Sequence, residues 1–159
     1  MINIYDFLKK YGIAYQKYDH PAVFTTNEAK TLAAHVPGTQ TKNLFLCDEK
    51  KRRFYLVSIC DDKRADLKHL REFLGEKSLR FAPADKLLEI LGLTPGSVSI
   101  LGLINDINHL VTFTIDEDLL KQEKIYAHPN INTATLAVSI NDLKKILQIT
   151  GHEPKLYKS

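Results

Sequence analysis

The chain has 159 residues and a formal net charge of +3, with 44% hydrophobic and 26% charged residues. These proportions are ordinary for a globular protein, and the length suits one domain that covers residues 1–159. No apolar run approaches the roughly 20 residues of a membrane helix, and the N-terminus lacks the apolar core of a signal peptide. We therefore expect a cytoplasmic protein without membrane association. We also expect a monomer, because no feature of the sequence indicates an obligate dimer.

Charge and cysteine content restrict the function less. The excess of positive charge is too small to establish nucleic-acid binding. Two groups of basic residues nevertheless stand close together in the sequence: Lys50, Lys51, Arg52 and Arg53, then Lys63, Arg64 and Lys68. The first group suits the solvated turn of a hairpin; a phosphate-contacting patch is the alternative, and it would make binding depend on salt. Cys47 and Cys60 lie in apolar runs, which favours buried reduced thiols over a disulfide or a catalytic thiol.

The chain begins with a short amphipathic helix. Apolar residues recur at helical spacing over residues 4–11, directly after Asn3, which is a good N-cap residue. Gly12 follows at the position where glycine commonly ends a helix. A short strand is then expected over residues 14–18.

A second helix and a hairpin follow. Thr25 and Glu28 form a capping box that opens a helix toward His35. The apolar segments Thr41–Cys47 and Phe54–Cys60 have the composition of strands, and a turn of charged residues separates them. A β-hairpin is the natural connection between two such segments.

The remainder of the chain alternates short helices with short strands. Helices are expected over residues 65–74, Ala84–Leu91 and 141–149, and strands over residues 79–81, 98–104, 110–115 and 133–139, with a further short strand near Ile125. Glycine ends each of these helices, at Gly75, Gly92 and Gly151, and Pro83 suits the first turn of the second. The tail, residues 152–159, is expected to be frayed. Without a regular βαβ alternation, the expected fold class is α+β, with a mixed, largely antiparallel sheet flanked by helices.

Several familiar chemistries have no motif in this sequence. It contains no Gly-x-Ser-x-Gly elbow, no phosphate-binding Gly-x-x-x-x-Gly-Lys run and no Gly-x-Gly-x-x-Gly fingerprint. The histidines at positions 20, 35, 69, 109, 128 and 152 stand apart, and none pairs with a nearby cysteine in a zinc-site spacing. We therefore expect no metal and no cofactor. Any hydrolysis would proceed by positioning, electrostatics and substrate-assisted attack.

Three segments place polar groups where a core is expected. The first is Thr41-Lys42-Asn43, at the start of an apolar strand. The second is Pro95-Gly96-Ser97-Val98-Ser99, a turn whose glycine lets backbone N–H groups approach a ligand closely. The third contains His128, which precedes a proline and is therefore biased to an extended conformation. Taken singly, each has a simpler structural interpretation: a solvated lysine, a plain turn and a structural histidine.

Four segments taken in order carry a family resemblance. They read DHPAVFTTNEA from position 19, TKNLFL from 41, LGLTPGSVSILGLIND from 91 and AHPNINTATLAVSINDL from 127. In this order they resemble the YbaK/prolyl-tRNA-synthetase-associated editing domains, and most closely the free-standing branch called ProXp-ala or PrdX, which deacylates alanyl-tRNA(Pro). The resemblance spans residues 5–147 and implies the α+β editing-domain fold and a tRNA(Pro) acceptor end as partner, with prolyl-tRNA synthetase as a further partner.

The resemblance also assigns site residues. Lys42 matches the lysine of the family near the terminal adenosine and its phosphate, and the adjacent Asn43 matches a pocket residue. Gly96, Ser97, Val98, Ser99 and Ile100 match a Gly-x-x-x-Pro loop whose backbone amides face the ester carbonyl. His128 matches the pocket histidine near the aminoacyl group. Ile100 departs from the family pattern, which has proline there, and this departure puts the rigidity of the loop and the size limit of the pocket in question.

These assignments lead to a mechanistic hypothesis. Water attacks the aminoacyl ester with assistance from the 2′-hydroxyl of the terminal ribose, and the loop amides stabilise the oxyanion. Lys42 holds phosphate as a point charge, and His128 orients the amino or carbonyl group of the substrate.

Three alternatives remain open from the sequence. The chain could instead deacylate cysteinyl-tRNA(Pro) or several small aminoacyl groups. It could be a non-catalytic module that binds aminoacyl-tRNA or a synthetase, which Ile100 favours. It could also be a small-molecule-binding domain, for which ligand binding would respond little to salt.

Overall fold

The computed structural model describes residues 1–19, 38–129 and 134–159. Within these ranges the α-helices are α1 (Ile4–Lys10), α3 (Leu67–Leu74), α4 (Ala84–Leu91), α5 (Glu117–Leu120) and α6 (Ile140–Thr150), and two 3-10 helices are η1 (Pro95–Ser97) and η2 (Ile100–Asn105). The strands are β1 (Gln16–Asp19), β2 (Thr41–Cys47), β3 (Phe54–Cys60), β4 (Arg80–Phe81), β5 (Val111–Asp116), β6 (Lys124–Ala127), β7 (Ala134–Ser139) and β8 (Lys155–Tyr157). The helix expected after Thr25 lies outside the described residues.

The strands form two sheets. The larger has the order β4-β2-β3-β5-β8 and the smaller the order β1-β7-β6. β2 and β3 form the expected hairpin, paired antiparallel from Thr41 opposite Cys60 to Cys47 opposite Phe54. β5 and β8 add to this hairpin in parallel, whereas every pair of the smaller sheet is antiparallel. The described residues therefore form the expected α+β fold with a mixed, largely antiparallel arrangement.

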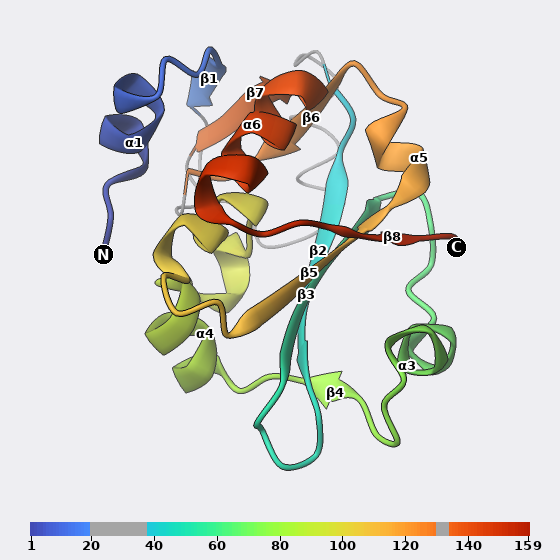
Figure 1. Ribbon diagram of the computed structural model, residues 1–159. Coiled ribbons are helices and arrows are strands. Elements are labelled where there is room, and N and C mark those ends of the chain that lie inside the picture. The colour runs from blue at the N-terminus through green and yellow to red at the C-terminus, as the bar shows by residue number, and fades with distance from the viewer. Residues whose placement is uncertain (20–37, 130–133) are drawn as a thin grey trace.

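The larger sheet is covered on both faces, as Figure 1 shows with α3 on one side and α4 and α6 on the other. Alternate residues of the β2–β3 hairpin point to opposite faces. Phe45 and Leu56 pack with α4, η2 and α6, while Leu46 and Val57 pack with Leu70 of α3. A further apolar cluster joins α1 to the smaller sheet, η2 and α6. No helix among the described residues is long and apolar enough to cross a membrane.

Local capping explains most helix boundaries. The Asn3 side chain accepts hydrogen bonds from the first turn of α1, and the Asp66 side chain does the same for α3. Gly75, Gly92 and Gly151 end α3, α4 and α6 in the left-handed conformation, as the sequence indicates. Pro83 occupies the N-cap position of α4, one residue before the expected place in its first turn.

The strand expected over residues 98–104 is wrong, because this segment forms η2. The Ser99 hydroxyl caps η2 by accepting from the Leu101 N–H, and residues 100–104 are all buried. A strand pattern alternates between two environments, but here the cores on both sides enclose the segment. Gly102 is required by close packing, since a Cβ there would lie 2.7 Å from a methyl of Leu93.

The expectation of a frayed tail is also wrong. Lys155–Tyr157 forms β8 and pairs in parallel with the end of β5. His152 is buried, and its Nε2 lies 2.9 Å from a carboxylate oxygen of Asp106. The tail is ordered by these distant partners, so its own sequence carries little sign of the strand.

Candidate functional site

The candidate lysine lies at the entry of the central hairpin. Along β2 the first three residues are half-buried and the next four are fully buried, so Lys42 stands where the sheet emerges from the core. Its Nζ donates to the main-chain carbonyl of Lys63 at 3.1 Å. Among the described residues Lys42 makes no ion pair, so a carbonyl dipole holds its ammonium group without neutralising it. Within the described part of the chain, no carboxylate competes for this charge.

Lys63, by contrast, has its charge neutralised. Its ammonium group lies 2.7 Å from Asp116 and 2.6 Å from Asp118. Burial lowers the pKa of Lys63, but the hydrogen bonds and charges of the two carboxylates outweigh that effect and raise it above its ordinary value. Lys63 therefore ties the segment after β3 to the end of β5 and the start of α5, and presents its carbonyl to Lys42. Lys63 belongs to the second basic group of the sequence, and these two ion pairs keep its ammonium group from contacting phosphate.

Asn43 connects β2 to the glycine loop. Its Nδ2 donates to the carbonyl of Val98 at 3.3 Å and to Thr41 Oγ1 at 3.4 Å. Its Oδ1 accepts a short hydrogen bond from the hydroxyl of Ser58, which lies directly opposite on β3. Both ends of the Asn43 amide are thus hydrogen-bonded, and the amide ties the glycine loop to β2 next to Lys42.

The third segment is attached through Thr41. The Thr41 hydroxyl donates to the carbonyl of Tyr126 at 3.3 Å, at the end of β6. His128 follows two residues later and is half-buried, with its Nδ1 3.4 Å from the carbonyl of Ala134. The structure therefore brings the segments of Lys42, Val98 and His128 together through a hydrogen-bonded network centred on Asn43.

The glycine loop offers backbone donors rather than a nucleophile. The Ser97 hydroxyl lies 3.2 Å from Thr94 Oγ1, and the main-chain N–H of Ser97 donates to the Thr94 carbonyl. The Ser99 hydroxyl caps η2. Neither serine contacts a histidine or carboxylate among the described residues. No hydrogen bond from the Gly96 or Ser99 N–H is found in the same ranges. Gly96 is exposed and Ser99 fully buried, so the Gly96 amide is the more accessible donor.

Ile100 fixes the end of the loop by packing. It is 1% exposed, and its side chain belongs to the core cluster formed with α4, α6 and the large sheet. It is also the first residue of η2, a position whose N–H is unpaired within a helix. Burial of this aliphatic side chain therefore anchors the end of the loop in the core.

Other reactive side chains have structural roles. Cys47 and Cys60 are free and buried, as expected, and burial raises the pKa of the Cys60 thiol. His69 bonds to the Tyr157 hydroxyl, and His109 lies 2.9 Å from the carbonyl of Thr150. Among the described residues no three His, Cys, Asp or Glu side chains are grouped so that they could hold a metal ion.

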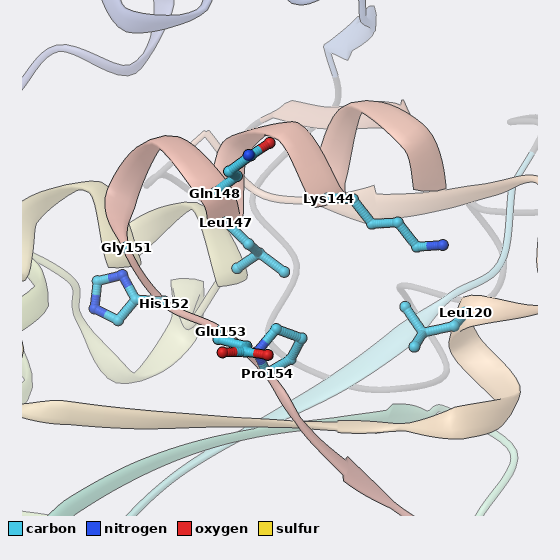
Figure 2. Close-up of a pocket in the computed structure, with 8 residues that line it drawn as sticks. All are labelled: Leu120, Lys144, Leu147, Gln148, Gly151, His152, Glu153 and Pro154. Carbon is cyan, nitrogen blue, oxygen red and sulfur yellow. The ribbon is translucent and has the colours of Figure 1, made fainter.

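A pocket of about 430 Å³ lies between α6 and the segment leading to β8, and the candidate site residues do not line it. Figure 2 shows α6 above this pocket and Pro154 below it, with Leu147 pointing into it. Its lining residues are Leu120, Lys144, Leu147, Gln148, Gly151, His152, Glu153 and Pro154, none of which the sequence predicts as a site residue.

Neither Ser58 nor the contact of Lys63 with Lys42 is predicted from the sequence. Ser58 lies in an apolar strand and reads as part of the core. The predicted hairpin contains the signal that could have found it, because pairing Cys47 with Phe54 puts Ser58 directly opposite Asn43. Two polar side chains that face each other inside an apolar hairpin are expected to form a hydrogen bond.

Comparison with known proteins identifies the family. The model of the aminoacyl-tRNA editing domain matches residues 20–146. The prolyl-tRNA editing protein ProX of Acetoanaerobium sticklandii is 37% identical over 145 residues, covering 91% of this chain and 88% of the relative. Prolyl-tRNA synthetase associated domain-containing protein 1 of Danio rerio is 38% identical over 151 residues, covering 94% and 82%.

Solved structures agree on the fold. The crystal structure of hypothetical protein APE2540 superposes with a TM-score of 0.74 at 22% identity, covering 97% of each chain. A crystal structure of a candidate trans-editing enzyme for prolyl tRNA synthetase gives a TM-score of 0.73 at 24% identity, covering 99% of this chain and 95% of the other. The chain therefore belongs to the aminoacyl-tRNA editing domain family, and it is a hydrolase that acts on the ester bond of aminoacyl-tRNA.

Proposed function

We propose that this chain removes alanine from mischarged alanyl-tRNA(Pro), acting as a free-standing monomer in the cytoplasm alongside prolyl-tRNA synthetase. The observation that carries the proposal is the Asn43 network, which joins the segments of Lys42, Val98 and His128. These are the residues that the family resemblance assigns to the site. The printed names of the relatives, a prolyl-tRNA editing protein and a prolyl-tRNA synthetase associated protein, support proline tRNA as the substrate carrier.

The physical need for such an enzyme follows from side-chain size. A synthetase pocket made for proline admits the smaller alanine and loses little binding energy, about 1–3 kcal/mol per missing methylene. A second site that admits only the smaller side chain and hydrolyses its ester corrects the error. The proposed site is this second sieve.

The reaction needs no protein nucleophile. Water attacks the ester carbonyl carbon and forms the new C–O bond, while the bond to the ribose 3′ oxygen breaks. The neighbouring 2′-hydroxyl accepts the proton from the water and passes its own to the leaving oxygen, so the products are alanine and uncharged tRNA. The backbone amides of the loop from Gly96 to Ser99, of which that of Gly96 is exposed, stabilise the oxyanion, a role worth about 10²–10³-fold in rate per donor.

Two side chains hold the substrate for this attack. Lys42, whose ammonium group has only a carbonyl partner among the described residues, binds a phosphate near the terminal adenosine as a point charge. His128 orients the amino or carbonyl group of the alanyl ester. Neither residue is required to transfer a proton.

The proposal is tested by hydrolysis of purified alanyl-, cysteinyl- and seryl-tRNA(Pro), with a chelator present. We expect alanyl-tRNA(Pro) to be the preferred substrate and the Lys42→Ala variant to lose most of the activity. Lys145→Ala is the matched control, because the Lys145 ammonium group also donates to a main-chain carbonyl, that of Tyr11, but on α6. Wild-type rates in Lys42→Ala would contradict the assigned site, and loss of activity on chelation would contradict a metal-independent reaction.

The same experiment separates the other functions. Faster hydrolysis of cysteinyl-tRNA(Pro) would make cysteine the principal target, and equal rates would indicate a broad deacylase. Binding of mischarged tRNA without hydrolysis would identify a non-catalytic module.

A further inference from the structure

Ser58 is a buried hydroxyl in a strand that is otherwise core. All seven residues of β3 are buried, and Ser58 is 0% exposed. Moving a hydroxyl from water to such a place is unfavourable unless it makes a hydrogen bond. Ser58 makes that bond to Asn43 Oδ1, its cross-strand partner.

This bond determines which way the Asn43 amide faces. An asparagine amide has an oxygen that only accepts and a nitrogen that only donates. Because the Ser58 hydroxyl occupies the oxygen, the nitrogen is directed to the carbonyl of Val98 and to Thr41. The reversed amide would put its oxygen against the Val98 carbonyl, and two acceptors would then face each other.

The hydrogen bond of the Ser58 hydroxyl is not a general requirement for burying a hydroxyl in this sheet. Thr114, on the adjacent strand β5, is equally buried, and its Oγ1 has no hydrogen-bond partner among the described residues. The sheet therefore accommodates one buried hydroxyl without a bond, whereas that of Ser58 is bonded to the residue that holds the glycine loop. This comparison also supplies a matched control from the same sheet.

We infer that Ser58 is a positioning residue for ester hydrolysis, which acts through Asn43 by fixing the direction of its amide. The inference rests on the proposed function. Ser58 is fully buried; it holds the amide that holds Val98, and so keeps the amides of the Gly96 loop in place relative to Lys42. Removing its hydroxyl should slow the chemical step more than it weakens substrate binding, because oxyanion donors act in the transition state.

The test is a double-mutant cycle of Ser58→Ala and Asn43→Ala, measured as kcat and KM for hydrolysis of mischarged tRNA(Pro). Ser58→Ala should lower kcat by about fivefold to tenfold, the effect of one ordinary hydrogen bond, and leave KM within about twofold. In the Asn43→Ala background the same change should alter kcat by less than about twofold, since a residue that acts through Asn43 has no further effect without it. Thr114→Val, which removes a buried hydroxyl with no partner, should match wild type. Ser58→Cys replaces the hydroxyl with a somewhat larger group that is a weaker donor, and should give an intermediate kcat.

Thermal unfolding of each variant separates positioning from loss of folding. A wild-type kcat in Ser58→Ala would overturn the inference, as would a full Ser58→Ala effect that persists in Asn43→Ala. If Ser58→Ala does not fold, the inference stands or falls on Ser58→Cys, whose kcat should be reduced at an unchanged melting temperature. A wild-type chain that hydrolyses no mischarged tRNA would overturn the proposed function and this inference with it, whereas an active wild type with an unaffected Ser58→Ala overturns the inference alone.

Discussion

The side-chain amide of Asn43 donates to the main-chain carbonyl of Val98 at 3.3 Å, across 55 positions of sequence. Replacing it with a carboxylate keeps the shape and the bond from Ser58 but sets a negative oxygen against that carbonyl. We expect Asn43→Asp to lower kcat/KM for mischarged tRNA by about tenfold to a hundredfold, the cost of an unpaired, half-buried acceptor. Steady-state deacylation kinetics measure this effect directly.

A second asparagine in the chain serves as control for that substitution. Asn105 Nδ2 donates to the carbonyl of Leu91 at 2.9 Å, and its Oδ1 accepts from the Ile2 N–H. Asn105→Asp should therefore lower the melting temperature while leaving kcat/KM near wild type. An equal loss of activity in both variants would mean that the Asn43 effect reflects general instability.

The two basic groups of the sequence are expected to differ in tRNA binding. The carbonyl of Lys63 holds Lys42, and the next residue, Arg64, is exposed, makes no ion pair among the described residues and lines a hollow of about 540 Å³. Arg52, by contrast, lies at the hairpin turn, which Figure 1 shows at the opposite end of β2 from Lys42. We expect Arg64→Gln to make the salt dependence of tRNA binding shallower by about 0.7–0.9, the slope of one phosphate contact.

Binding of uncharged tRNA over a series of salt concentrations gives these slopes. Arg52→Gln is the matched control and should leave the slope unchanged. The reverse result, an altered slope only in Arg52→Gln, would put the phosphate contact at the hairpin turn. Lys63→Gln should lower stability, because the buried carboxylate of Asp116 would lose its cationic partner.

Acid should destabilise the fold through Asp106. Its side chain is 1% exposed, and burial raises its pKa, but hydrogen bonds from His152 and from the N–H groups of Val111 and Leu110 outweigh burial and hold the pKa below its ordinary value. A carboxyl whose pKa is lowered by folding contributes stability above its unfolded pKa, about 3.9. That contribution disappears as the pH falls through the lower folded value.

We therefore expect Asp106→Asn to lose about 1–3 kcal/mol of unfolding free energy at neutral pH, because buried hydrogen-bond donors would be left without an acceptor. The fall in stability below about pH 4 should also become shallower. Urea unfolding between pH 3 and 7 measures both effects. Glu89→Gln breaks the exposed pair with Lys86 and should change stability by less than about 0.5 kcal/mol. An unchanged acid limb in Asp106→Asn would exclude Asp106 as its source.

Local signals made much of the fold predictable. The caps at Asn3, Gly75 and Gly92 act through neighbouring residues, so the sequence alone places α1, α3 and α4 to within about two residues. The strands of the central hairpin are both predicted with their observed ends. By contrast β8 exists because Lys155–Tyr157 pairs with β5, and such a partner is not visible in the local sequence.

The candidate site also combines features that the sequence indicates with contacts between distant segments that it does not. Lys42, the Gly96 loop and His128 could be named from sequence only through their order along a family pattern, because each has a simpler structural interpretation alone. What joins them is tertiary: Asn43 reaches Val98, and Thr41 reaches Tyr126. These contacts depend on how the hairpin packs against η1 and β6, and no periodicity in the sequence encodes that packing.

Ile100 tests whether packing can take the place of the proline that the family resemblance implies at this position. The residue before it, Ser99, is already extended, with φ −146° and ψ 148°, as a residue before proline must be. Ile100 begins η2, where φ is about −50 to −70° and the N–H has no partner within the helix, so a proline ring fits without losing a hydrogen bond. We expect Ile100→Pro to fold and to keep its kcat within about threefold of wild type, because the loop exchanges a packed side chain for a fixed φ.

Ile100→Ala is the contrasting variant. It removes the buried side chain and adds no ring, so it should lose about 2–5 kcal/mol of unfolding free energy through the cavity it leaves. It should also lower kcat more than Ile100→Pro does, because the loop then lacks both means of fixation. Unfolding and deacylation, measured on the same preparations, compare the stability and the kcat of the two variants. If Ile100→Pro proved less active than Ile100→Ala, the loop would need freedom at this position, and packing would not be the substitute for proline.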